Sequence, residues 1–433
     1  MNDFSRRVLT PPPTEPGDTP RPRHHRAGPF GVLDIGSTKI ACLIGRTESD
    51  GTLRVLGFGW HRGRGVRGGG IVDLDEAERA IRACVGQAEE MADTRLSNVT
   101  VNLSCGNPES RLFNVEWPVN GRAVDASDIR RVVAEGRARA IVEGREIIHA
   151  LPLSFIVDGM EDVPDPRGLH CDVLKARLHV VDAAATQLRN LTTVINRCDL
   201  EIFDLVSAPM AAGLATLVPD ERELGATVVD MGGGTTGMAV FAQGQLLHTV
   251  HLPVGGAHVT NDLARVLSTP VSHAERLKTL YGNTQTSHDD ERELLPVPLV
   301  GEEEHQIAKV PRAMVINIIR PRLEETFELV KERLEQSGFA RAAGTRVVLT
   351  GGASQLAGVR ELAARILGRQ IRLGRPQGLR GLPDSASGPA FATAAGLLAW
   401  CAGQGRVMQD LEFDVEKPKG LFRRIAGFLK ERL

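Results

Sequence analysis

The strongest constraint on the fold of this chain is a short turn that occurs twice. Asp34-Ile-Gly-Ser-Thr38 follows one apolar strand, and Asp230-Met-Gly-Gly-Gly-Thr-Thr236 follows another much later in the chain. Each copy has an aspartate at the strand end, glycines that let another group approach the backbone, and hydroxyl side chains that donate hydrogen bonds. This self-similarity predicts two related domains that face each other across a cleft lined by both turns.

A third glycine turn has the composition of a nucleotide contact. Leu349-Thr-Gly-Gly-Ala-Ser354 follows an apolar strand and precedes a helix that we expect from about Gln355. Free backbone N–H groups at a helix start and a flat glycine surface suit a nucleotide. Each turn alone is most often a structural hairpin or strand-helix connection, but packing needs rarely produce three of them in this order.

Length and composition exclude several classes of protein. With 433 residues the chain exceeds the size of a single hydrophobic core, so more than one domain is expected. A formal net charge of -2 offers no overall field for nucleic acid, and the six scattered cysteines have no spacing typical of zinc sites or disulfide frameworks. Because no apolar run is long enough to span a bilayer and no signal peptide is evident, we expect the bulk of the protein in the cytoplasm.

The order of predicted elements favours an α/β fold. Strands and helices alternate between Lys175 and Leu217, and three-strand meanders are predicted around both aspartate turns. Long helices are predicted over 74–91, with Asp73 as N-cap, and over 312–336. The stretch 282–309 is polar and acidic without periodicity, so we expect a loop there.

Several of these motifs resemble those of one superfamily. Asp34 to Lys39 is similar to the first phosphate motif of the actin, sugar-kinase and chaperone ATPase superfamily, and Asp230 to Thr236 to the second. Gly351 to Ser354 resembles its adenosine motif. The segments 207–212 and 389–396 resemble the two connections that hinge its domains.

Within that superfamily, the phrases at 64–73, 220–225 and 349–353, together with a basic amphipathic C-terminus, resemble the FtsA family of bacterial cell division proteins. The resemblance implies duplicated actin/ribonuclease-H-like α/β domains around a nucleotide cleft, an inserted subdomain and a C-terminal amphipathic helix. The implied division is a disordered tail at 1–28, a first domain at 29–97 and 174–206 to which 385–401 returns, an inserted subdomain at 98–173, a second domain at 207–384 with a smaller subdomain at 256–337, a linker at 402–416 and a membrane helix at 417–433.

The same resemblance implies that the chain binds ATP with Mg²⁺. It assigns the metal to Asp34 and Asp230, the phosphates to Gly36, Ser37, Thr38, Lys39, Gly232, Gly233, Gly234, Thr235 and Thr236, and the nucleoside to Glu275, Lys278, Gly351, Gly352 and Ala353. A surface helix is the alternative interpretation for Glu275 and Lys278.

Hydrolysis is expected to be slow or negligible. Polymerising relatives such as MreB carry a glutamate just before the first connecting helix, whereas Ser207 and Ala208 stand at that place here. Because a serine is a poor base, we assign no catalytic residue and expect ATP to act mainly as a ligand that closes the cleft and favours polymerisation.

Family resemblance also implies partners. FtsA-like proteins polymerise at the cytoplasmic membrane, tether the ring of the tubulin-like FtsZ to it and help to recruit later membrane proteins of the divisome. Arg322 and Glu325 match positions that receive the C-terminal peptide of FtsZ. A solvated charged helix face is the alternative for these two residues.

The C-terminal segment has the pattern of a helix that lies in a membrane interface. At helical spacing the apolar residues fall on one face of the helix and the charged residues on the opposite face. The residues predicted to contact the membrane are Leu421, Phe422, Arg423, Arg424, Ile425, Phe428, Leu429 and Lys430. Its basic residues would face an anionic membrane surface, which predicts a peripheral protein on the cytoplasmic side of the membrane at the division site. A helix docked on the globular body is the alternative.

Three other functions share parts of the pattern. A sugar kinase of the same fold requires a substrate-side aspartate base, which is not clearly present. A pilus-assembly relative shares the nucleotide turns, but the basic C-terminal helix disfavours it. A peptide-binding chaperone requires a substrate domain after the ATPase domain. We do not expect this function, because little chain follows Cys401.

Overall fold

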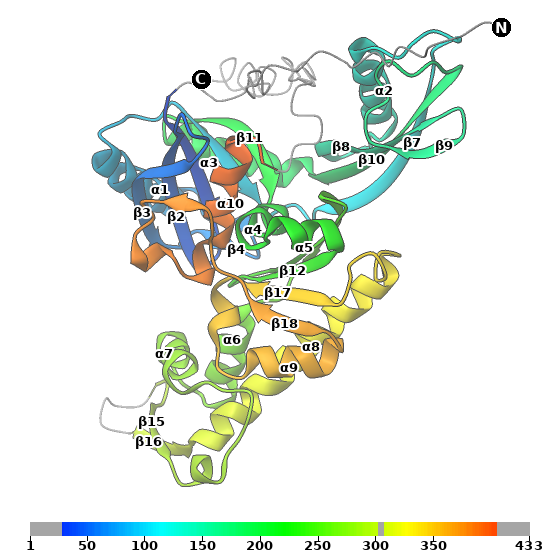
Figure 1. The fold of residues 1–433 in the computed structure, drawn as a ribbon. Coiled ribbons are helices and arrows are strands. Elements are labelled where there is room, and N and C mark those ends of the chain that lie inside the picture. Colours follow the sequence, from blue (N-terminus) through cyan, green and yellow to red (C-terminus); the bar gives the residue numbers. More distant parts are fainter. Residues whose placement is uncertain (1–27, 302–306, 405–433) are drawn as a thin grey trace, which may run out of the picture.

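The computed structural model describes residues 28–301 and 307–404 (Figure 1). The predicted tail at 1–28, apart from its last residue, and the predicted membrane helix at 417–433 lie outside the described residues. Two large domains stack around a central layer of helices, and a third, smaller module extends from the upper domain (Figure 1).

The first domain is built on a mixed six-stranded sheet. In sheet order its strands are β11 (Glu201–Ser207), β6 (Asn98–Leu103), β1 (Phe30–Ile35), β2 (Lys39–Thr47), β3 (Leu53–Arg62) and β19 (Leu379–Arg380). The helices α1 (Leu74–Ala92) and α3 (Ala185–Arg197) pack on one face of this sheet. As predicted, the carboxylate of Asp73 caps α1 by accepting from the N–H groups of Asp75 and Glu76, both at 3.0 Å.

The second domain repeats this arrangement. Its sheet has the order β14 (Gln245–Leu252), β13 (Thr236–Ala242), β12 (Ala226–Met231), β17 (Arg346–Thr350), β18 (Gln370–Leu373). In both domains the first strand pairs antiparallel with the second and parallel with a later one, β6 in the first domain and β17 in the second. The duplicated α/β fold inferred from the two turns is therefore confirmed.

Two helices are shared by the domains. α4 (Ala208–Thr216) and α10 (Ala392–Cys401) bury their side chains against residues of both sheets in one continuous core. Such shared burial explains why both helices are apolar on all sides. They are the segments expected to connect the domains.

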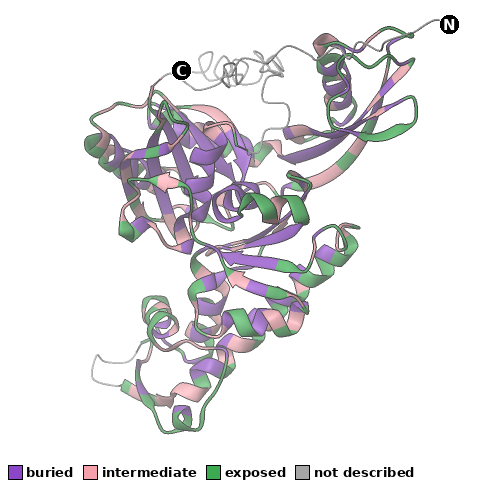
Figure 2. Cartoon of the chain, viewed as in Figure 1, coloured by how far each residue is buried: buried purple, intermediate pink, exposed green. Residues whose placement is uncertain are grey.

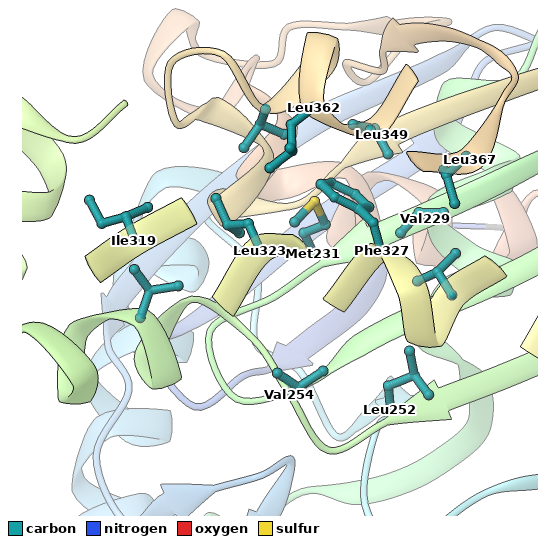
Figure 3. Packing of buried hydrophobic residues seen from close by; sticks show 14 of the residues in the cluster. Val229, Met231, Leu252, Val254, Ile319, Leu323, Phe327, Leu349, Leu362 and Leu367 are labelled. Carbon is teal, nitrogen blue, oxygen red and sulfur yellow. The ribbon is translucent and has the colours of Figure 1, made fainter. Parts of the chain in front are cut away.

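The outer face of the second sheet is covered by α8 (Arg312–Gln336) and α9 (Val359–Leu367). Figure 3 shows Phe327 and Leu323 of α8 against Met231 and Val229 of β12. The helix α6 (Gly256–Val266) packs against α8 and α7 (Val271–Tyr281), and a 3-10 turn at His288–Glu291 also contacts α8.

The expectation of a loop at 282–309 is wrong in part. Strands β15 (Leu294–Pro298) and β16 (Ile307–Pro311) form an antiparallel hairpin there. Leu295 and Val297 are buried, while Pro296 and Pro298 disguise the alternating pattern of an edge strand.

The inserted module is a four-stranded antiparallel sheet covered by one helix. Its sheet order is β7 (Glu109–Pro118), β10 (Val173–Ala184), β8 (Arg145–Val157), β9 (Met160–Val163), and α2 (Ala126–Arg139) packs on one face. The burial of that face is visible in Figure 2. The predicted boundaries 98–173 are wrong at both ends, because β6 pairs with β1 and β11 of the first sheet and β10 pairs with β7 and β8. Alternation in the sequence reveals strands but not the sheet that each one joins.

Short elements complete the described chain: β4 (Val66–Arg67), β5 (Gly70–Ile71), α5 (Pro219–Leu224) and 3-10 turns at Gly352–Gln355, Asp384–Ala386 and Pro389–Phe391. Within residues 28–301 and 307–404, none of the helices has the length and apolar character needed to cross a membrane.

Candidate functional site

The two aspartate turns have the same internal geometry. The N–H of Gly36 donates to the carbonyl of Lys39 at 2.9 Å, and the N–H of Gly232 donates to the carbonyl of Thr235 at 2.9 Å. A Cβ atom at Gly36 would lie 2.8 Å from the Lys39 oxygen, and one at Gly232 would lie 2.9 Å from the Thr235 oxygen. Both turns therefore need glycine at this position.

These turns face each other directly. A Cβ atom on Gly233 would lie 2.3 Å from Cγ2 of Thr38, and one on Gly234 would lie 2.3 Å from Oγ of Ser37. Together they border a cavity of about 610 Å³, a size typical of small-molecule sites. All the predicted nucleotide and metal residues except Thr236 line it: Asp34, Gly36, Ser37, Thr38, Lys39, Asp230, Gly232, Gly233, Gly234, Thr235, Glu275, Lys278, Gly351, Gly352 and Ala353.

Thr236 lies away from the cavity. It is fully buried at the start of β13, and its hydroxyl donates to the carbonyl of Val254 at 2.8 Å. The prediction that this side chain contacts phosphate is therefore not supported by its placement. Successive side chains of a strand point to opposite faces, so the end of a motif can be turned inward.

The two aspartates line the cavity, Asp34 as a buried residue and Asp230 as a half-buried one. Burial raises the pKa of Asp230 to about 6, with the hydroxyl of Thr393, 2.9 Å from its Oδ2, opposing the rise. Burial also raises the pKa of Asp34, opposed by the Lys39 ammonium 3.4 Å from its Oδ2. A nearby cation would reverse both effects, because it favours the charged carboxylate.

Lys39 is fixed between the domains. Its ammonium donates to the carbonyl of Ala390 at 2.5 Å and lies 3.9 Å from the centre of the Phe391 ring. The charge therefore stays at the edge of the cavity, close to Asp34, instead of extending into solvent.

The third glycine turn closes the opposite wall. Gly351 has φ of 82°, and a Cβ atom there would lie 2.4 Å from Oδ1 of Asp230 and 2.5 Å from the carbonyl of Met231. Its N–H donates to the carbonyl of Pro389 at 3.1 Å. This glycine is thus required both by its conformation and by the closeness of the second aspartate.

Glu275 and Lys278 lie on α7 at the mouth of the cavity. The Lys278 ammonium contacts Oε2 of Glu275 at 2.7 Å, Oγ1 of Thr260 at 2.8 Å and the carbonyl of Gly256 at 3.1 Å. These bonds hold α7 against the start of α6. The two side chains border the cavity and brace it at the same time.

Several lining residues were not predicted, including Asn102, Ser104, His251 and Thr393. His251 lies directly opposite Gly237 in the second sheet, and Gly237 lies opposite Asp230. Only strand register reveals this row, and no local signal in the sequence marks it. Ser207, the residue just before α4, is fully buried at the end of β11.

Arg322 and Glu325 do not line the cavity, although Leu323 between them does. On α8 the guanidinium of Arg322 donates to both carboxylate oxygens of Asp262 on α6, at 2.7 and 3.2 Å, and also bonds Glu325. The eight predicted membrane residues between 421 and 430 lie outside the described residues.

Comparison with known proteins reveals the family of this chain. A sequence model described as "Cell division protein FtsA" matches residues 227–396, and one described as "SHS2 domain inserted in FTSA" matches residues 106–182. The chain is 45% identical over 380 residues to the cell division protein FtsA of Agrobacterium fabrum, covering 85% of this chain and 86% of that protein. The chain belongs to the FtsA family of cell division proteins.

Other FtsA proteins support the same assignment. Identity is 44% over 426 residues with FtsA of Rhizobium meliloti, covering 94% of this chain and 95% of that protein. It is 32% over 378 residues with FtsA of Escherichia coli K12, covering 84% and 88%. The SHS2 match falls on β7, α2, β8, β9 and β10, so the inserted module is the one typical of FtsA.

Solved structures confirm the actin-like fold. A chain of the PilM-PilN type IV pilus biogenesis complex superimposes with a TM-score of 0.62 at 17% identity, covering 86% of this chain and 98% of that one. MreB 5 of Spiroplasma citri bound to AMPPNP superimposes with a TM-score of 0.52 at 14% identity, covering 85% and 94%. At such identities the likeness concerns the fold, while the FtsA relatives define the family.

Proposed function

We propose that this FtsA family member binds ATP with Mg²⁺ in the cavity between its two domains. The observation that carries the proposal is the pair of equivalent glycine turns, each with an aspartate, that face each other across one cavity. Backbone N–H groups and the hydroxyls of Ser37, Thr38 and Thr235 provide donors for phosphate oxygens. A protein of the same fold, MreB 5, has been solved with AMPPNP.

The aspartates fit a hard divalent cation. Asp34 and Asp230 carry oxygen ligands of the type that Mg²⁺ prefers, and a cation would offset the unfavourable burial of both carboxylates. The ion would neutralise phosphate charge. The wall formed by Gly351, Gly352 and Ala353 would receive the adenosine, with Glu275 and Lys278 near the mouth.

A titration with a fluorescent ATP analogue and Mg²⁺ tests this site. The Gly351→Ala protein is expected to bind at least tenfold more weakly, because the new Cβ would lie 2.4 Å from Oδ1 of Asp230. Gly378→Ala is the matched control: its φ of 74° imposes similar strain, but nothing lies within 4 Å of the new Cβ. Equal affinities of both variants and the wild type would contradict the proposed site.

We further propose that the chain polymerises at the cytoplasmic membrane, tethers FtsZ and helps to recruit later divisome proteins. Membership of the FtsA family supports a role in cell division. Basic and apolar residues alternate at helical spacing within 417–433, which supports an anchor in an anionic membrane surface. One short helix binds marginally, so polymerisation would strengthen attachment by combining many anchors.

The proposed FtsZ contact is the face of α8 that carries Arg322 and Glu325. Arg322→Glu is expected to weaken binding of the FtsZ C-terminal peptide at least tenfold, as measured by fluorescence anisotropy. Because Arg322 also holds α6 through Asp262, Asp262→Asn is the control that removes this ion pair without reversing the charge on α8. If Asp262→Asn weakens binding as much as Arg322→Glu, the effect is structural and the docking role is wrong.

A further inference from the structure

The second sheet places a histidine beside the proposed metal residue. Across β12, β13 and β14, Asp230, Gly237 and His251 are directly opposite one another. Residues opposite in adjacent strands share a face of the sheet, and two strand spacings separate the outer pair by about 10 Å. Gly237 has no side chain, and the ring of Pro209 on α4 occupies the space above it, between the positions of the carboxylate and the imidazole.

The start of α4 forms the other side of this part of the cavity. Ala208, Pro209, Asp230, Gly237 and His251 all line it. A Cβ atom on Gly237 would lie 3.0 to 3.1 Å from the ring of Pro209, so β13 and α4 approach closely there. The aspartate and the histidine therefore face one enclosed end of the cavity.

His251 is held in a defined orientation. Its Nε2 lies 3.3 Å from the hydroxyl of Ser207, the residue just before α4. Ser207 is itself fixed, because its backbone N–H donates to Nε2 of His149 at 3.1 Å. No partner of His251 Nδ1 occurs among the described residues, and burial lowers the pKa of this histidine to about 4. The ring is therefore neutral near pH 7 and keeps a lone pair.

Resting on the proposed ATP site, we propose that His251 holds the attacking water during ATP hydrolysis and that Ser207 is a positioning residue for its ring. Nε2–H donates to the Ser207 hydroxyl, and Nδ1 accepts a hydrogen bond from water. The water oxygen forms a bond to the γ-phosphorus, the bond from that phosphorus to ADP breaks with its electron pair leaving on ADP, and the water proton passes to an oxygen of the released phosphate.

Ser207 and Ala208 at the start of α4 provide no carboxylate to hold the water, and the pair of His251 and Ser207 would take this role. An imidazole whose pKa is depressed to about 4 is a weak base, so it orders the water more than it deprotonates it. Slow turnover follows from the same burial that keeps the ring neutral.

The test compares ATP affinity with hydrolysis at saturating Mg²⁺ATP in full-length protein. His251→Ala is expected to keep the dissociation constant within twofold and to lower the hydrolysis rate at least tenfold. His251→Asn, whose amide oxygen occupies a place near that of Nδ1, is expected to retain more of the rate. Added imidazole is expected to restore hydrolysis in His251→Ala, which a purely structural role would not allow. His288→Ala is the control, because His288 is exposed and does not line the cavity.

Each outcome decides between the two proposals. If the wild type does not bind ATP, the proposed site itself fails. If it binds ATP but His251→Ala hydrolyses at the wild-type rate, loses affinity in parallel with rate, or is not rescued by imidazole, the role of His251 is wrong. A wild type that binds ATP without measurable hydrolysis also overturns that role.

Discussion

Gly396 occupies the closest contact between the two helices that join the domains, and its replacement by alanine should destabilise the protein. A Cβ atom there would lie 1.7 Å from the carbonyl oxygen of Ala211. Carbon and oxygen approach to about 3.3 Å in such contacts, so α10 and α4 would have to separate by about 1.5 Å. A displacement of this size places the cost of overpacking near the upper end of about 1 to 3 kcal/mol, which exceeds the gain of about 1 kcal/mol that alanine has over glycine in a helix.

The net expectation for Gly396→Ala is therefore a loss of stability. Because α4 and α10 share one core with both sheets, the strain is transmitted to both domains. At about 2 to 4 °C per kcal/mol, the melting temperature should fall by several degrees. Differential scanning calorimetry without nucleotide measures this directly.

Gly86→Ala is the matched control, for which we expect a gain in stability instead of a loss. Gly86 lies within α1, and nothing lies within 4 Å of a Cβ atom built on it. The same substitution should raise stability by about 0.5 to 1 kcal/mol, because only the helix preference changes. A Gly396→Ala protein that melts at or above the wild-type temperature would refute the close packing of α10 on α4.

Three further predictions concern polar side chains with internal hydrogen bonds. Ionised Asp230 is unfavourable in the folded state, since burial raises its pKa from 3.8 to about 6. Without nucleotide, Asp230→Asn should therefore raise the free energy of unfolding by up to about 3 kcal/mol at pH 8 but by only about 0.5 kcal/mol near pH 4, as measured by urea unfolding. Thr236→Val should lower stability by about 1 kcal/mol through its lost internal bond and leave ATP affinity within twofold, as measured by denaturation and titration. Ser110 bonds both His179 at 2.6 Å and His248 at 3.1 Å, so Ser110→Ala should loosen the inserted module on β14 and speed hydrogen exchange in 106–182.

The glycine turns were predictable because their constraint is local. A tight hairpin after an aspartate needs glycine whatever surrounds it, and the repeat of that signature gave the duplicated fold before any contact was known. The helices over 74–91 and 312–336 were also recognisable from periodicity and capping.

Features set by strand register were not predictable. The row from Asp230 to His251 exists only because β12, β13 and β14 pair in one register. Strand pairing also turns the side chain of Thr236 away from the cavity. It likewise explains why the observed boundaries of the inserted module differ from the predicted ones. In β15 the prolines concealed an edge strand, because they interrupt the expected alternation without preventing a hairpin.

Liposome co-sedimentation tests the central claim most directly. Full-length protein and a version ending at residue 416 would be mixed with vesicles of anionic lipid, ATP and Mg²⁺, with and without FtsZ. The account predicts that only the full-length protein pellets, that pelleting rises steeply with protein concentration and with ATP, and that FtsZ is carried along. If both proteins stay in the supernatant, or the shortened one brings FtsZ to the vesicles equally well, the membrane-tether account is contradicted.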